Sequence, residues 1–179
     1  VRKGVKLPNL KSVNGEPYNN GINYSAVGDA GAKRLDEKEG TTYRMDNLAI
    51  AKEMHTAKKD PEKIKFATGW ELGADNKWRL EEDNAEVKDT AKVLSTIEKK
   101  KANNQTIYLS NIIQDNNVVK AYPGIKHLKV IDSSKEEQFK GGAEWDSKRV
   151  WLPLEDLSTN PEYFKEVLNH EVQHIIQEI

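Results

Sequence analysis

Cysteine is absent from the 179 residues of this sequence. Its absence excludes disulfides, thiolate catalysis and cysteine-ligated zinc, so any zinc site must be built from His, Asp or Glu side chains. Long apolar runs are missing too, and no segment approaches the length of a transmembrane helix or of a signal-peptide core. The sequence therefore predicts neither a disulfide-stabilised protein nor a membrane-spanning one.

Charge of one sign is not in excess either, since 28 basic residues stand against 29 acidic ones and the net charge is −1. No overall field would draw the protein to nucleic acid or to an anionic membrane, and we expect neither partner. Hydrophobic residues make up 36% of the chain, with four Trp and six Tyr, which suffices for a folded core. This length predicts one medium domain or two small ones.

The N-terminal part divides into an arm and a helical module. Residues 1–30 are rich in Gly, Asn and Pro without a regular period, which predicts an arm or loop. From residue 31 to about 59 the pattern is helical, and Asp60-Pro61 ends that helix and begins a short one. The highly charged stretch 84–105 is predicted to be a linking segment or an exposed helix. We assign residues 31–105 to one module.

A β-hairpin is predicted within 67–82, because Trp70 and Trp78 flank the turn sequence GADN. Asn stands in this turn where Gly would be usual, and Asn tolerates the positive φ that such turns require. We expect both indole rings to pack together against a helix residue such as Leu48 or Met54, giving the module its own small core.

Residues 106–179 have a different pattern. A strand is predicted near 127–132, and a hairpin turning at the sequence DSK leads into a second strand near 148–153. A long periodic helix follows from Pro161 to the end, with Ser, Thr and Asn before it as caps. The sequence therefore predicts an α+β protein with a small mixed sheet packed against this C-terminal helix.

The last helix carries His170, Glu171 and His174 in the stretch EVLNHEVQHIIQEI. On a helical wheel of about 100° per residue, both histidines lie beside the apolar stripe, and Glu171 lies on the same semi-buried side. The other polar residues of the helix are predicted to face solvent on the opposite side: Glu162, Lys165, Glu166, Asn169, Gln173 and Gln177. A uniformly solvated helix would not separate its polar residues in this way.

This spacing is the one that zinc hydrolysis requires. Residues four apart lie one above the other on a helix, so His170 and His174 can bind one zinc ion at nitrogen–zinc distances of about 2.0–2.1 Å. Glu171 lies too far to the side to ligate with them and is placed to act as general base on a zinc-activated water. Glu171 then passes the proton to the leaving amine while zinc polarises the carbonyl group.

Two other interpretations of the motif stay open. With four histidines in the chain, the match could arise by chance, or the helix could keep the shape of a metal site without binding metal. The two remaining histidines, His55 and His127, lie in other contexts, and we expect a structural or surface role for each.

The sequence does not identify a third zinc ligand, although catalytic zinc takes three protein ligands. Glu178 is the only acidic residue after His174, and it lies about 12 Å along the helix axis from His170, so we expect it not to complete the site. The chain stops inside a helical pattern, and we expect it to be a fragment whose third ligand lies beyond Ile179. As it stands we expect it to be inactive and either metal-free or only weakly occupied by zinc. If zinc binds tightly nonetheless, the first candidates within the chain are Glu144, Asp146 and His127.

A family resemblance covers about residues 31–179. The segment AKRLDEKEGTTYRMDNLAIAKEMHTAKKDPEKIKFATGWELGADNKWRLE resembles the large polyvalent protein-associated domains, which occur in many-domain proteins of phages and conjugative elements, often from Bacteroidetes. The stretches AYPGIKHLKVID, GGAEWDSKRVWLP and LNHEVQHIIQ are similar to the zincin-like metallopeptidase domain that follows in such proteins. The ATGW and GADNKWR stretches are fairly specific to the family, whereas many unrelated peptidases share the zincin motif.

The resemblance implies zinc ligands at His170 and His174 and a general base at Glu171. It also implies a sheet edge beside the cleft, where an extended peptide substrate adds as a strand. The residues of that edge strand are Arg149, Val150, Trp151 and Leu152.

We therefore expect a zinc-dependent metallopeptidase that acts on a peptide or protein substrate, with the module at 31–105 positioning or regulating the catalytic part. The resemblance places such a protein in the cytoplasm, or in a host cell to which it is delivered with mobile DNA. The alternative is a non-catalytic zincin-like module that binds a protein partner. Replacement of Glu171 by Gln separates the two, because in an enzyme it abolishes turnover and leaves the metal bound.

Overall fold

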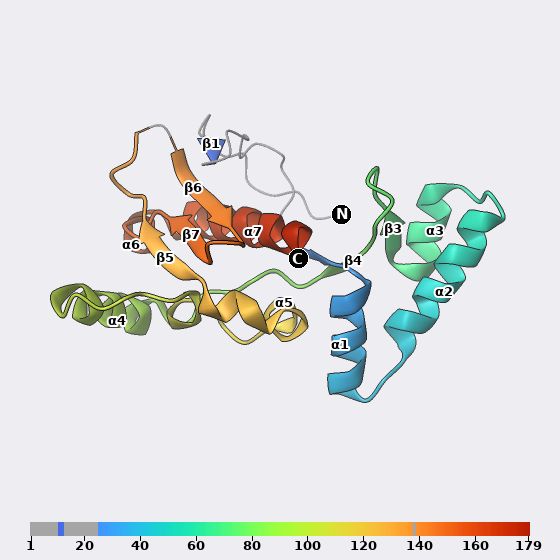
Figure 1. The fold of residues 1–179 in the computed structure, drawn as a ribbon, viewed down its shortest axis with the longest axis horizontal. Coiled ribbons are helices and arrows are strands. Elements are labelled where there is room, and N and C mark those ends of the chain that lie inside the picture. The colour runs from blue at the N-terminus through green and yellow to red at the C-terminus, as the bar shows by residue number, and fades with distance from the viewer. Residues whose placement is uncertain (1–10, 13–24, 138) are drawn as a thin grey trace.

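The computed structural model describes residues 11–12, 25–137 and 139–179, so most of the predicted arm at 1–30 lies outside the described residues. Helices alternate with short strands that form two separate sheets, which confirms the α+β class. Figure 1 shows two lobes side by side. One lobe holds three helices and a hairpin from the N-terminal half, and the other holds the larger sheet with the C-terminal helix.

Three helices form most of the first lobe. The helical stretch predicted from residue 31 to about 59 is divided by Gly40, whose φ of 68° ends the first helix. Glycine adopts this left-handed conformation without strain, so the chain can turn there. The short helix predicted after Asp60-Pro61 is present, and the Asp60 carboxylate accepts a hydrogen bond from the Glu62 N–H at 2.8 Å. The bounds are α1 (Asp29–Glu39), α2 (Tyr43–Thr56) and α3 (Pro61–Thr68).

The predicted hairpin is present as β3 (Trp70–Leu72) and β4 (Trp78–Glu82), which pair antiparallel. Asn76 in the turn has a φ of 61°, as its tolerance of this conformation allows. A third strand, β2 (Ser25–Val27), pairs with the other side of β4 and gives the order β2-β4-β3. The prediction of an arm over 1–30 misses β2, because three residues are too few to show a strand period.

The segment between the two sheets contains one long helix and several short ones. The prediction of a linker or exposed helix at 84–105 is correct for α4, although Val93 and Ile97 on its inner side are buried. The bounds of these helices are α4 (Thr90–Ala102), η1 (Leu109–Asn111), α5 (Asn117–Ala121) and η2 (Pro123–His127).

The larger sheet is mixed, as predicted. Its order is β1-β6-β7-β5, with β7 antiparallel to β6 and parallel to β5. The two-residue β1 pairs parallel with the start of β6. The bounds are β1 (Lys11–Ser12), β5 (Lys129–Asp132), β6 (Phe139–Glu144) and β7 (Arg149–Leu152).

The short α6 (Asp156–Thr159) leads into α7 (Pro161–Glu178), the helix that the sequence predicts from Pro161 to the end. The Asn160 side chain caps α7 by accepting a hydrogen bond from the Tyr163 N–H at 3.3 Å. α7 packs against β6 and β7 on one side and against β2 on another, so it contacts both sheets. Within the described ranges, no helix is both long enough and apolar enough to cross a lipid bilayer.

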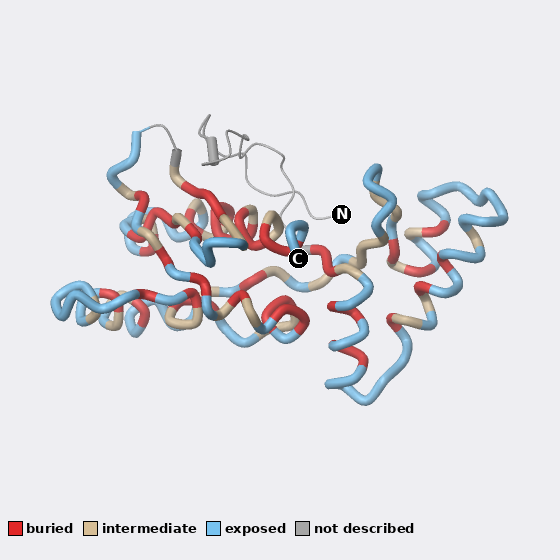
Figure 2. The backbone as a smooth tube through the Cα atoms, in the orientation of Figure 1, coloured by how far each residue is buried: buried red, intermediate tan, exposed pale blue. Residues whose placement is uncertain are grey.

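Buried side chains form one continuous cluster that includes residues of both lobes (Figure 2). Trp70 and Leu48 belong to it, and Met54 and Trp78 pack against it, as the predicted contact between the hairpin and the second helix requires. Trp70 is fully buried and its indole N–H donates to the Arg44 carbonyl at 3.0 Å. The first lobe therefore shares its core with the second and does not have a separate one.

Candidate functional site

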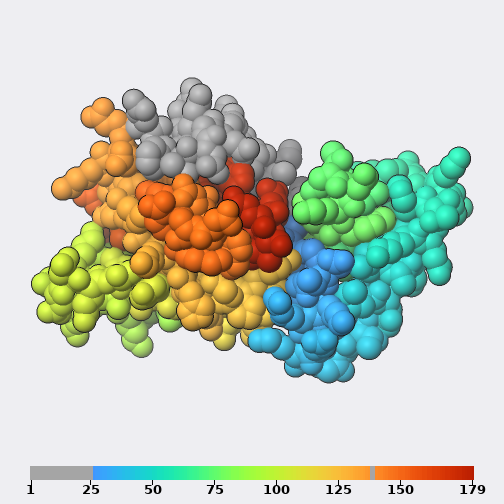
Figure 3. All heavy atoms as spheres, viewed as in Figure 1, coloured from blue at the N-terminus to red at the C-terminus, as the bar shows by residue number. Residues whose placement is uncertain are grey.

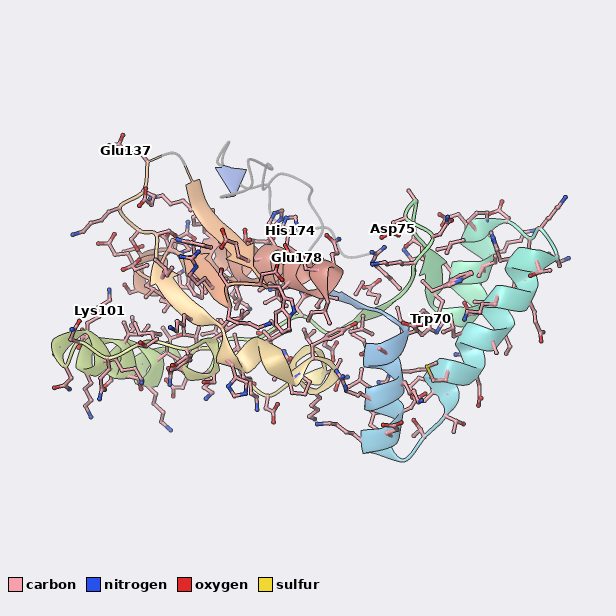
Figure 4. All side chains as sticks on the ribbon, viewed as in Figure 1. Trp70, Asp75, Lys101, Glu137, His174 and Glu178 are labelled. Atoms are coloured by element: carbon pink, nitrogen blue, oxygen red, sulfur yellow. The ribbon has the colours of Figure 1, made fainter. Side chains whose placement is uncertain are left out.

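The side chains of His170 and His174 converge. Their Nε2 atoms are 2.9 Å apart, and the ring centroids are 4.5 Å apart with an angle of 75° between the ring planes. Both residues lie on α7 one turn apart, as the four-residue spacing dictates. Figure 4 shows His174 toward the C-terminal end of α7, with Glu178 one turn further on. The two Nε2 atoms are therefore close enough to ligate a single cation after a small separation.

Burial favours the neutral form of His170. His170 is partly buried, and desolvation together with the nearby His174 lowers the pKa of His170 to about 4. A histidine must lose its proton before it can ligate a metal, so at neutral pH this side chain is already in the form that binds.

Glu171 directly follows His170 in the sequence. Its side chain is fully buried. The helical wheel places Glu171 about 100° round the helix from His170, and this side of α7 lies in the core. A carboxylate in this position contacts the protein interior and is held in place by it. The predicted role of Glu171 as general base stays a prediction.

No third ligand joins the pair in the described part of the chain, where no group of three or more His, Asp or Glu side chains is arranged to hold a metal ion. Glu144 instead accepts hydrogen bonds from Ser147 and from Arg149, which closes the turn between β6 and β7. His127 is exposed at the end of η2, and Asp146 is exposed in the turn.

Glu178 has a structural contact of its own. Its Oε2 accepts a hydrogen bond from the Trp145 backbone N–H at 2.9 Å and so ties the end of α7 to the β6–β7 turn. His55 also has a structural contact, since its ring meets the edge of the Trp78 ring with centroids 5.8 Å apart. This contact agrees with the structural role expected for His55.

The edge strand implied by the resemblance is not at an edge. β7 pairs with β5 through all four of its residues and with β6 on its other side, so no peptide can add to it. The assignment of a substrate-edge strand is therefore wrong for Arg149, Val150, Trp151 and Leu152. The predicted hairpin accounts for β6 on one side of β7 only. The parallel pairing with β5 on the other side joins strands that are distant in the sequence, and no local pattern shows it.

The polar side of α7 faces solvent only in part: Glu162 and Gln177 are exposed as the wheel predicts, but other residues of this side are not. Asn169 and Glu166 are buried, and the Asn169 amide forms a pair of hydrogen bonds with the backbone of Ala85, at 2.9 Å from the Ala85 N–H and 3.4 Å to its carbonyl. One turn further on, the Gln173 amide pairs in the same way with the backbone of Ala26, at 2.9 and 3.5 Å. These two amides hold α7 against β2 and against the segment that follows β4.

The amide pairs limit rotation of α7 about its own axis. Asn169 and Gln173 each precede one of the histidines, so contacts that hold the amides also determine where the imidazoles point. The prediction missed both residues because a wheel shows only which residues share a side of a helix and not what covers that side. The sequence gives one signal for these contacts: Asn169 and Gln173 are four residues apart, as the two histidines are.

Comparison with known proteins gives one family. Residues 28–92 match the family described as large polyvalent protein associated domain 23. The match begins at the start of α1, includes the hairpin and ends in the first turn of α4. No curated protein and no solved structure matches the chain.

Proposed function

We propose that this chain is part of a polyvalent protein in which residues 106–179 carry the site of a zinc-dependent peptidase. His170 and His174 are two of the zinc ligands in this proposal. The observation that carries it is the convergence of the two Nε2 atoms to 2.9 Å on one helix, next to a buried glutamate. The match of residues 28–92 to a polyvalent protein associated domain supports the kind of protein but says nothing of its chemistry.

The two histidines supply two of the three protein ligands that catalytic zinc takes. Two nitrogens bound tetrahedrally at about 2.0–2.1 Å lie roughly 3.3 Å apart, so the imidazoles need to separate by only a few tenths of an ångström from the observed 2.9 Å. Both atoms are the Nε2 of a histidine, an ordinary zinc ligand. The third protein ligand of the proposed site comes from outside the described residues.

Glu171 is the general base of the proposed reaction. Bound zinc would supply a Lewis acid that polarises the scissile carbonyl and makes a water molecule acidic. The Glu171 carboxylate would accept a proton and deliver it to the leaving amine. Glu171 directly follows His170 on α7 and is fully buried, so its carboxylate is shielded from bulk solvent.

A second candidate function is a zincin-like module that binds a protein partner and has no catalysis. The same 2.9 Å distance favours it, because one neutral imidazole can donate its Nε2–H to the other and satisfy the pair without a metal. Zinc binding distinguishes the two candidates, since only the first requires the histidines to separate around an ion.

The test is a calorimetric zinc titration of the chain and of its His170→Ala and Glu171→Gln variants. We expect weak binding that His170→Ala abolishes and Glu171→Gln retains. Zinc binding that is the same after His170→Ala contradicts the metal assignment. Absence of zinc binding in the full-length protein, with the fold intact, supports the non-catalytic module.

Turnover is measured on a denatured protein substrate with the full-length protein. Glu171→Gln should remove the activity while zinc remains bound, because the amide cannot accept a proton from water. Glu162→Gln is the matched control, since Glu162 is an exposed acid in the first turn of the same helix. Equal activity in the Glu171→Gln variant and the wild type would refute the role of Glu171.

A further inference from the structure

A cavity of about 470 Å³ lies where the end of α7 meets the start of α1 and the β3–β4 hairpin. Figure 3 shows these three parts meeting beside one another, α1 in blue, the hairpin in green and α7 in red. Neither histidine of the candidate metal site lines the cavity, so it is a separate feature of the molecule. Its volume lies within the range of small-molecule sites, which commonly occur between the parts of a protein.

The walls combine apolar surface with positive charge. Leu48, Trp78 and Ile176 supply apolar surface from three different elements. The Trp78 ring is partly buried, and the edge-on contact with His55 holds it in one orientation. A flat aromatic ligand can therefore stack on Trp78 without first ordering it.

The charge of the lining is unbalanced. Three cations, Lys52, Lys77 and Arg79, line the cavity against one acidic residue, Asp29. Arg79 is held by Asp75 at 2.6 Å, and Asp75 lies at the hairpin turn outside the lining (Figure 4). For Lys52 and Lys77, the described residues provide no carboxylate within ion-pair distance. Both ammonium groups are therefore available to an anion.

We infer that this cavity binds a small anion that carries a flat aromatic ring. The ring stacks on Trp78 and covers the apolar wall, while the anionic group is attracted by Lys52 and Lys77. A neutral ligand of the same shape gains only the stacking, and an anion without a ring gains only the charge interaction. The inference is independent of the proposed peptidase and of any metal.

The test compares two fluorescent dyes with the same rings, the anionic anilinonaphthalene sulfonate and the neutral phenylnaphthylamine. We expect the chain to bind the anionic dye at one site and more tightly than the neutral dye, with an affinity that falls as salt is added. Reversal of both lysines, Lys52→Glu with Lys77→Glu, should weaken binding of the anionic dye by at least about tenfold. Equal affinity for the two dyes overturns the inference.

The matched control reverses two exposed lysines that lie far from the cavity, Lys92→Glu with Lys99→Glu on α4, a helix that packs against α6 and η1 rather than against the elements lining it (Figure 1). It changes the net charge by the same amount and should leave the affinity within about twofold, because charges beyond a Debye length are screened. If this control weakens dye binding as much as the reversal of Lys52 and Lys77 does, the attraction comes from the net charge of the whole molecule and the inference is wrong.

The position of the dye is read from the indole N–H signals of the four Trp residues in an NMR spectrum. Replacement of Trp78 by Phe assigns the Trp78 signal, which should shift with the same saturation curve as the fluorescence. The signals of Trp145 and Trp151, on the β6–β7 side, should stay in place. A shift of these two signals without a shift of Trp78 would place the dye elsewhere and overturn the inference.

Discussion

Replacement of Asn169 by Ala tests whether the histidine-bearing helix depends on its contact with the segment that follows β4. In the folded chain the Asn169 amide accepts from the Ala85 N–H at 2.9 Å and donates to the carbonyls of Ala85 and Lys165, at 3.4 and 2.9 Å. Ala85 is fully buried, so water cannot take the place of the lost amide. The substitution therefore leaves the backbone of Ala85 without a partner in the core.

The expected loss of stability comes from the backbone N–H and carbonyl of Ala85, which lose their hydrogen-bond partner. A buried N–H that loses its partner costs about 1–3 kcal/mol, and the weaker bond to the carbonyl adds less. The Lys165 carbonyl lies within α7 and is less affected, since helical hydrogen bonding remains open to it. We expect a total loss of about 2–3 kcal/mol in the free energy of unfolding, a large share of the roughly 5–15 kcal/mol of an ordinary domain.

The assay is urea unfolding followed by circular dichroism, which gives the free energy and its dependence on urea concentration. The control is Gln177→Ala, because Gln177 is an exposed amide two turns further along the same helix. The control should change stability by less than about 0.5 kcal/mol. If Asn169→Ala loses no more than the control, the pairing with Ala85 contributes nothing to stability, and the argument that the segment after β4 holds α7 in place fails.

Three more predictions follow from single contacts. Gly31→Ala should lose about 1–3 kcal/mol in a urea melt, because the new Cβ would lie 2.7 Å from the Tyr122 ring; Gly40→Ala, with open space around it and a φ of 68°, should lose about 1 kcal/mol. Trp70→Ala should lose about 3–5 kcal/mol, and an unchanged thermal melt would show that the ring is not in the core. Finally, stability should fall as pH drops from about 6.5 toward 4: the unfolded His170 takes up a proton in that window and the folded one, with its pKa lowered to about 4, does not. In the His170→Gln variant the free energy of unfolding should depend less on pH. An equal pH dependence in the variant and the wild type would contradict the role of His170.

Features that depend on neighbouring residues could be predicted from the sequence. The hairpin between Trp70 and Trp78, the helix start at Asp60-Pro61 and the capped start of α7 all follow from turn and cap residues within a few positions. The convergence of His170 and His174 likewise follows from helical geometry alone. None of these features depends on a contact with a residue that is distant in the sequence.

Features that depend on distant partners could not be predicted in this way. The pattern of β7 is the same for an edge strand and for a central one, and only the pairing of β6 on one side and β5 on the other decides between them. β6 gave a weak signal because glycine disfavours strands, and β2 gave none because it is three residues long. The division of the first helical stretch at Gly40 could have been found, since glycine at a helix end is a common stop.

The contacts of Asn169 and Gln173 bear on the proposed zinc site of this chain. The motif describes only which residues of α7 share a side, yet the side next to it is paired with Ala26 and Ala85. Ala85 lies within the segment that matches a polyvalent protein associated domain, and Ala26 lies in the strand that pairs with its hairpin. The histidines therefore sit on a helix whose orientation is set in part by that segment, so residues 106–179 without residues 28–92 would lose the Ala85 contact that helps to aim the imidazoles.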